Sequence, residues 1–177
     1  MDSYEELLQT AADAGVQVFE HFDLNGDSEP GCTLKGLYID GCIALDSTLK
    51  TAAEKSCVLA EELGHHYTTA GNILDLSDVQ NRKQERKARM WGYNHRIGLS
   101  GILETFLAGC QNRYEMARHL DVTEEYLAEA LEAYRHKYGE FVEVGNYILC
   151  FEPYLGVIQK WDKPDPQHEA APFDHEA

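Results

Sequence analysis

The sequence Glu61-Glu62-Leu63-Gly64-His65-His66 predicts a helix that presents acidic and imidazole groups in a fixed arrangement. With 3.6 residues per turn, Glu61 and His65 lie on one face, one turn apart. Glu62 follows Glu61 by about 100° around the helix and borders that face. Carboxylate and imidazole are both accepted zinc ligands. The helix therefore offers two of the three protein ligands that a catalytic zinc site uses.

This spacing is that of the zinc-peptidase signature H-E-x-x-H, with a glutamate in place of the first histidine. By analogy Glu61 and His65 would bind the metal. Glu62 would be the general base that takes a proton from the attacking water and passes it to the leaving amine. Glu62 and His66 also stand four residues apart and form an alternative ligand pair, although the phase of the signature favours Glu61 and His65.

Glu85 is the best candidate for the third ligand. It lies in a predicted helix from 78 to about 94, with Ala88 and Gly92 on the same face. Small side chains there would let this helix approach the first one closely enough for a carboxylate to reach the ion. We expect zinc, or another divalent metal, in a Glu-His-Glu site. Such a site is harder and more anionic than a His-His-Glu site, so we expect slower hydrolysis or a shifted metal preference.

On the bare pattern, E-E-x-x-H is more typical of a solvated acidic helix face that carries histidines by chance than of a metal site. His95, which follows the Glu85 helix, is a candidate for stabilising a developing oxyanion. The other histidines outside the motif have no partner at ligand spacing and are weak signals. Context therefore decides between a metal site and an ordinary helix surface.

Three segments resemble the ImmA/IrrE family of metallopeptidases. Residues 57–67 are similar to the family's active-site segment, L-A-H-E-L-G-H-[HY]. The family pattern E-x-x-A-x-x-[FW]-[AG] is matched downstream by Glu85, Ala88, Trp91 and Gly92. Upstream, residues 35–41 resemble the segment that precedes the family's active-site helix. The resemblance covers roughly residues 4–135, most of the chain.

The resemblance implies a cytoplasmic bacterial or phage-borne protease of a mobile element, which cleaves or otherwise neutralises a helix-turn-helix repressor. It implies His65 and Glu85 as metal ligands and Glu62 as the catalytic base. Glu61 stands where the family usually has its first zinc histidine. Two functions therefore stay open: a metal-dependent endopeptidase, and a weakly metallated or metal-free homologue that sequesters the repressor without cleavage. A toxin–antitoxin or host-takeover component is a third alternative.

Composition narrows the class of partner. The net charge of −16 argues against direct nucleic-acid binding, because phosphates require a basic face, and suits a basic protein partner. No apolar run approaches the roughly 20 residues that span a bilayer, and the acidic N-terminus lacks the basic region of a signal peptide. We therefore expect a cytoplasmic protein with no membrane partner. The five cysteines form no C-x-x-C pair and indicate reduced thiols.

We expect a zincin-like α+β fold in a single domain, residues 1–161, followed by a flexible acidic, proline-containing tail, residues 162–177. A short antiparallel sheet, with a hairpin at Asp40-Gly41, would pack on two long helices that carry the site. A helical pair and a C-terminal β-hairpin would follow. The predicted helices are 2–14, 49–69, 78 to about 94, 114–120 and 124–138, and the predicted strands are 16–19, 34–39, 42–45, 141–151 and 154–161.

The helical pair at 114–120 and 124–138 resembles a helix-turn-helix. A DNA reader carries basic or amide side chains on its second helix. This helix instead presents Glu124, Glu125, Glu129 and Glu132. We expect a structural helix pair that is available to a protein partner.

Overall fold

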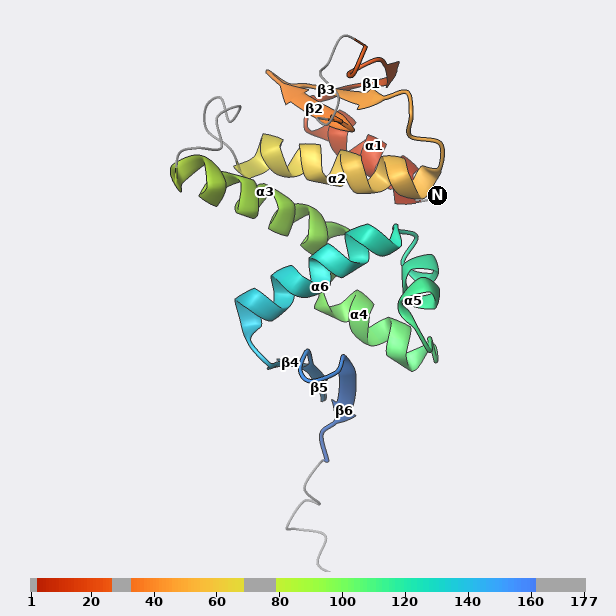
Figure 1. Ribbon diagram of the computed structural model, residues 1–177, viewed down its shortest axis with the longest axis vertical. Helices are drawn as coiled ribbons and strands as arrows, with labels where there is room; N and C mark the ends of the chain where they lie inside the picture. The colour runs from red at the N-terminus through yellow and green to blue at the C-terminus, as the bar shows by residue number, and fades with distance from the viewer. Residues whose placement is uncertain (1–2, 27–32, 69–78, 162–177) are drawn as a thin grey trace, which may run out of the picture.

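The computed structural model describes residues 3–26, 33–68 and 79–161 (Figure 1). These residues form an α+β fold of six helices and two three-stranded sheets. The helices are α1 (Ser3–Asp13), α2 (Ala52–Thr68), α3 (Val79–Arg96), α4 (Gly98–Leu107), α5 (Arg113–His119) and α6 (Glu124–Tyr138). The strands are β1 (Gln17–Phe22), β2 (Gly36–Ile39), β3 (Cys42–Asp46), β4 (Phe141–Val144), β5 (Tyr147–Cys150) and β6 (Gly156–Gln159).

The first sheet is mixed, and the prediction of an antiparallel sheet was wrong. The hairpin of β2 and β3 around Asp40-Gly41 is confirmed. However, β1 pairs in parallel with β3, so that the strand order is β1-β3-β2. The physical reason is that β1 joins the far side of β3 instead of pairing with β2, the next strand along the chain.

Helix α2 lies between the first sheet and α3 (Figure 1). The two helices touch through their backbones. A Cβ atom on Gly64 would lie 2.2 Å from the carbonyl oxygen of Ala88, and one on Gly92 would lie 3.0 Å from that of Ala60. The close approach predicted from the small residues Ala88 and Gly92 is therefore confirmed. Gly64 makes the tightest of these contacts. The prediction named only the small residues on α3, and not this glycine on α2.

The described chain after α3, residues 97–161, contains one helix more and one strand more than predicted. Helix α4 follows α3 with only Ile97 between them, and it buries Ile102 and Thr105. The predicted C-terminal hairpin is instead a three-stranded antiparallel sheet, β4-β5-β6. The run 141–151 is divided because Gly145, with a φ of 58°, turns the chain back after β4. Helix α6 has the predicted bounds, and Thr123 caps it by accepting a hydrogen bond from the Tyr126 N–H.

The described residues bury two hydrophobic cores. The N-terminal core lies between α1, the first sheet and α2, and it contains Leu7, Ile43, Leu59 and Leu63. The C-terminal core joins the end of α3 to α4, α5, α6 and the second sheet, and it contains Ile102, Leu127, Tyr134 and Leu149. Helix α2 also contributes Cys57 to the C-terminal core. The two cores are thus connected through the α2–α3 pair.

Residues 162–177, predicted as a flexible tail, lie outside the described part of the chain. The single-domain boundary at 161 therefore stays a prediction. Cys42, Cys57, Cys110 and Cys150 are free thiols. Over the described ranges, none of the helices combines the length and the apolar character needed to cross a bilayer.

Candidate functional site

The α2–α3 contact brings the three predicted ligands together in one cluster. Glu61 and His65 extend from α2, and Glu85 extends from α3. His65 Nε2 lies 3.4 Å from Glu85 Oε2. The guanidinium of Arg89 connects the other pair, because its Nε lies 2.7 Å from Glu61 Oε1 and 2.9 Å from Glu85 Oε1. We refer to Glu61, His65, Glu85 and Arg89 as the Arg89 cluster.

Arg89 was missed by the sequence reasoning. Its position four residues after Glu85 on a helix was the available signal, since such pairs face each other. Its Nη1 also lies 3.5 Å from Glu129 Oε2 on α6. Burial disfavours the charge of Arg89, but the neighbouring Glu61 and Glu85 carboxylates outweigh that effect and raise its pKa further above the ordinary value. Arg89 is therefore a fixed positive charge among three acids.

Burial also perturbs the predicted ligands. It raises the pKa of Glu61, and the charge of Arg89 opposes this shift. It lowers the pKa of His65, and the charge of Glu85 opposes that shift. His65 Nδ1 is buried without a hydrogen-bond partner. The cluster thus contains an imidazole nitrogen whose hydrogen-bonding capacity is unused.

Glu62 lies against β2. The Tyr38 backbone N–H donates a hydrogen bond to its carboxyl group. A Cβ atom on Gly36 would lie 2.7 Å from Glu62 Oε1 and 2.6 Å from Val58 Cγ1, so a larger residue there would force these side chains to shift. Burial, together with the negative charges of Glu61 and Glu85, raises the pKa of Glu62 to about 8. Glu62 therefore has the perturbed pKa that is typical of an acid–base residue.

The alternative pair of Glu62 and His66 faces β2 instead of α3. The Tyr38 hydroxyl and His66 Nδ1 are 2.9 Å apart, within hydrogen-bond distance. His95, the candidate for stabilising an oxyanion, lies elsewhere on α3. Its ring stacks on Trp91 with the centroids 4.8 Å apart, and Trp91 stacks on Tyr67. The structure therefore brings Glu85 to Glu61 and His65, and leaves His66 and His95 in other contacts.

The chemistry of the Arg89 cluster suits a divalent cation, although its present geometry does not. Two carboxylates and one imidazole are a plausible ligand set for zinc or a harder metal. Within the residues that the structure describes, however, no group of three histidine, cysteine or acidic side chains is arranged to hold a metal ion. The reason is visible in the contacts: Glu61 and Glu85 both turn towards the guanidinium.

Comparisons of the chain with models of protein families, with curated proteins and with solved structures find no match.

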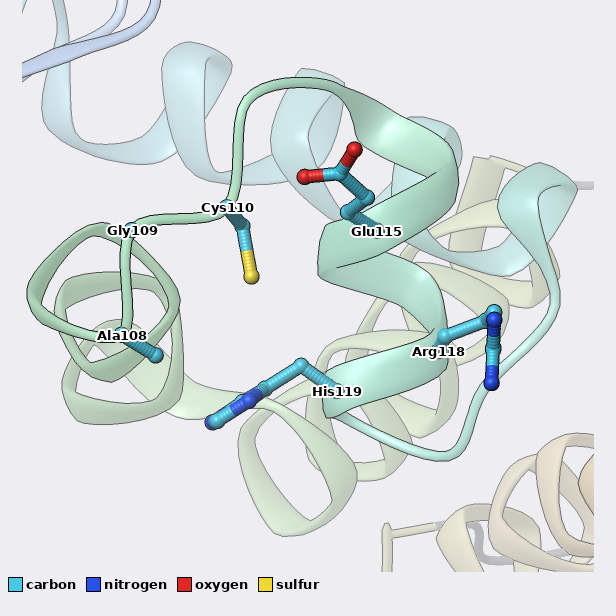
Figure 2. Close-up of a pocket in the computed structure, with 6 residues that line it drawn as sticks. All are labelled: Ala108, Gly109, Cys110, Glu115, Arg118 and His119. Atoms are coloured by element: carbon cyan, nitrogen blue, oxygen red, sulfur yellow. The ribbon is translucent and has the colours of Figure 1, made fainter.

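A separate cavity of about 350 Å³ lies between the end of α4 and α5 (Figure 2). Its lining includes Cys110, Glu115 and His119. Glu115 accepts hydrogen bonds from the Gln111 backbone N–H and from Asn112 Nδ2, so its carboxylate is engaged at the start of α5. The residues of this cavity belong to α5 and to the connection between α4 and α5, and none of them comes from the Arg89 cluster.

Proposed function

We propose that the protein is a metal-dependent endopeptidase of the ImmA/IrrE type that acts in the cytoplasm on a specific protein. A helix-turn-helix transcriptional repressor of a phage or mobile element is the proposed substrate. The observation that carries this proposal is the convergence of Glu61, His65 and Glu85 from two helices, with Glu62 beside them. The sequence resemblance supports the same roles for these residues.

In this proposal Glu61, His65 and Glu85 hold a divalent ion, most simply zinc. Such an ion supplies a Lewis acid for the scissile carbonyl and makes water more acidic. Glu62 moves the protons: its carboxylate accepts one from the attacking water and returns it to the leaving amine. A pKa of about 8 in the metal-free protein means that Glu62 is mostly protonated at neutral pH. The positive charge of a bound divalent ion would lower the pKa of Glu62 and so favour its carboxylate form.

The position of β2 supports cleavage within a chain. Strand β2 lies at the edge of the first sheet, and its Tyr38 N–H contacts Glu62. An edge strand can pair with an extended peptide through backbone hydrogen bonds. A substrate segment bound there would run past Glu62 with residues on both sides of the cleaved bond, as an endopeptidase requires.

The test uses a purified helix-turn-helix repressor of a phage or mobile element as the substrate. Repressor is incubated with zinc-loaded protein, and fragments are identified by mass spectrometry. We expect cleavage by the unaltered protein and at least a 100-fold loss in Glu62→Gln, because general acid–base catalysis contributes about 10²–10⁴-fold. Metal content and thermal stability should be retained. The exposed Glu104→Gln is the control. Cleavage that persists in Glu62→Gln would show that Glu62 is not the base.

Repressor binding without cleavage is the second candidate, and one observation favours it. Arg89 already forms ion pairs with both Glu61 and Glu85. A protein in which these carboxylates are paired without an ion could keep the fold for binding alone. Stable binding of the repressor by metal-free protein, with no fragments after zinc is added, would support this candidate over the endopeptidase.

A further inference from the structure

We propose that Arg89 is a built-in counter-cation that competes with the metal ion for Glu61 and Glu85 and thereby sets the metal affinity of the site. This inference rests on the proposed metal-dependent function and concerns how that same site is controlled. Arg89 would not touch substrate. It acts as a positioning residue, through the two carboxylates that it holds.

The contacts of Arg89 make the competition unavoidable. Its Nε lies 2.7 Å from one predicted ligand and 2.9 Å from another. Nε carries one hydrogen and donates it to Glu85 Oε1, and the positive charge of the guanidinium also pairs with Glu61 Oε1. A divalent ion placed beside it would add like-charge repulsion at close range. The ion and the guanidinium therefore compete for the negative charge of Glu61 and Glu85.

Glu129 can pair with the Arg89 guanidinium when it leaves Glu61 and Glu85. Glu129 Oε2 on α6 already lies 3.5 Å from Arg89 Nη1 and accepts a hydrogen bond from the Tyr93 hydroxyl at 3.0 Å. The side chains of Arg89 and Glu129 are 44% and 56% exposed, so a small swing of the guanidinium meets little packed structure. Glu129 thus keeps the charge of Arg89 paired when the two α2–α3 carboxylates are released.

This arrangement predicts opposite effects for two substitutions. Arg89→Gln removes the competitor, and zinc affinity should rise at least tenfold, or about 1.4 kcal/mol. Glu129→Gln removes the acceptor of the displaced guanidinium, and zinc affinity should fall. A merely structural role for Arg89 would weaken zinc binding in both variants.

The experiment is a competition titration of chelator-stripped full-length protein with zinc and a chromophoric chelator. The matched control is Arg86→Gln, which removes one positive charge from the exposed surface of the same helix. Its affinity should stay within about twofold of the unaltered protein, since exposed charges interact weakly through water. Arg89→Lys keeps a cation in the cluster and should restore most of the competition.

The outcomes separate this inference from the proposed function. Zinc binding by the unaltered protein, with equal or weaker binding in Arg89→Gln, would overturn the role of Arg89 and leave the metal site intact. No zinc binding in any variant would overturn the metal-dependent function and this inference together. If circular dichroism shows that Arg89→Gln does not fold, Glu129→Gln decides: unchanged or tighter zinc binding there would overturn the role of Arg89.

Discussion

At the scale of single residues, the surroundings of Asp46 and Glu62 shift their pKa values in opposite directions. Glu62 is buried beside other acids, which raises its pKa. Asp46 is 3% exposed, but both of its oxygens accept hydrogen bonds. Oδ1 accepts from the Thr48 N–H and hydroxyl, and Oδ2 accepts from the Leu24 N–H and Asn25 Nδ2. The bond from the Thr48 hydroxyl is the largest of the effects that lower the pKa of Asp46.

Asp46→Asn should therefore make the protein less stable and less sensitive to acid. The pKa of Asp46 is lower in the folded state than in the unfolded chain, where it is about 3.9. Its charge thus contributes stability above that unfolded value, and this contribution is lost as the pH falls through the folded pKa. We expect a loss of about 1–3 kcal/mol at pH 7. Urea unfolding from pH 7 to pH 3 measures it, and parallel stability profiles for both proteins would contradict this account.

At the scale of helices and strands, the contact between α2 and α3 sets the geometry of the candidate site. Their backbones are in contact at Gly64, where the opposing atom is the Ala88 carbonyl oxygen. This contact fixes how far Glu85 stands from Glu61 and His65. A carbonyl oxygen cannot rotate away as a side chain can, so any added atom must push the helices apart.

Gly64→Ala should destabilise the protein by about 1–3 kcal/mol, the usual range for overpacking. It should do so although alanine favours a helix over glycine by about 1 kcal/mol. Gly101→Ala in α4 is the matched comparison, since its Cβ would meet side-chain methyl groups, of Leu120 at 3.1 Å and of Ile97 at 4.0 Å, and no backbone atom. That variant should be neutral or more stable. Thermal unfolding measures both, and equal losses in the two variants would contradict the argument.

Local signals explain which elements could be predicted. Helix α6 has both of its ends marked, by the cap at Thr123 and by Gly139 after its last residue. The hairpin of β2 and β3 is specified by Asp40-Gly41. The pairing of β1 with β3 depends on residues far apart in the chain, and no local pattern specifies it. Helix α4 was missed because Gly98 and Gly101 weaken a helical pattern that tertiary packing restores.

The candidate site likewise combines features that local patterns specify with features that depend on the tertiary fold. Helical periodicity and two small residues were enough to predict that Glu61, His65 and Glu85 meet. The insertion of Arg89 depends on how the charges balance when no ion is present, which spacing alone does not reveal. Glu129 contacts Arg89 from α6, and this contact depends on the tertiary fold. The residue types of the site could thus be predicted, but not the cation that pairs with them.

The whole molecule consists of two cores connected through α2 and α3. Ile43 is fully buried in the N-terminal core, and Leu127 is fully buried in the C-terminal core. The Arg89 cluster lies on the α2–α3 pair and reaches α6 through Glu129. Its residues therefore depend on both halves of the molecule.

Ile43→Ala and Leu127→Ala should loosen different parts of the structure. Each removes fully buried side-chain volume and should cost about 2–5 kcal/mol. Native-state hydrogen exchange resolves where that loss is felt. We expect Ile43→Ala to lower protection mainly in α1 and the first sheet, and Leu127→Ala mainly in α4 and α6. Uniform loss of protection in both variants would indicate one cooperative unit.

Gly36 and Gly64 add two positions to the E-E-x-x-H motif by which other sequences with the same packing around Glu62 and α2 can be recognised. A larger residue at position 36 would collide with Glu62 and Val58, and one at position 64 would collide with the carbonyl oxygen of Ala88. A chain with the letters E-E-x-x-H but bulky residues at these two places must hold its acid and its helices differently. The two glycines therefore distinguish proteins that share this geometry from proteins that share only the residues of the motif.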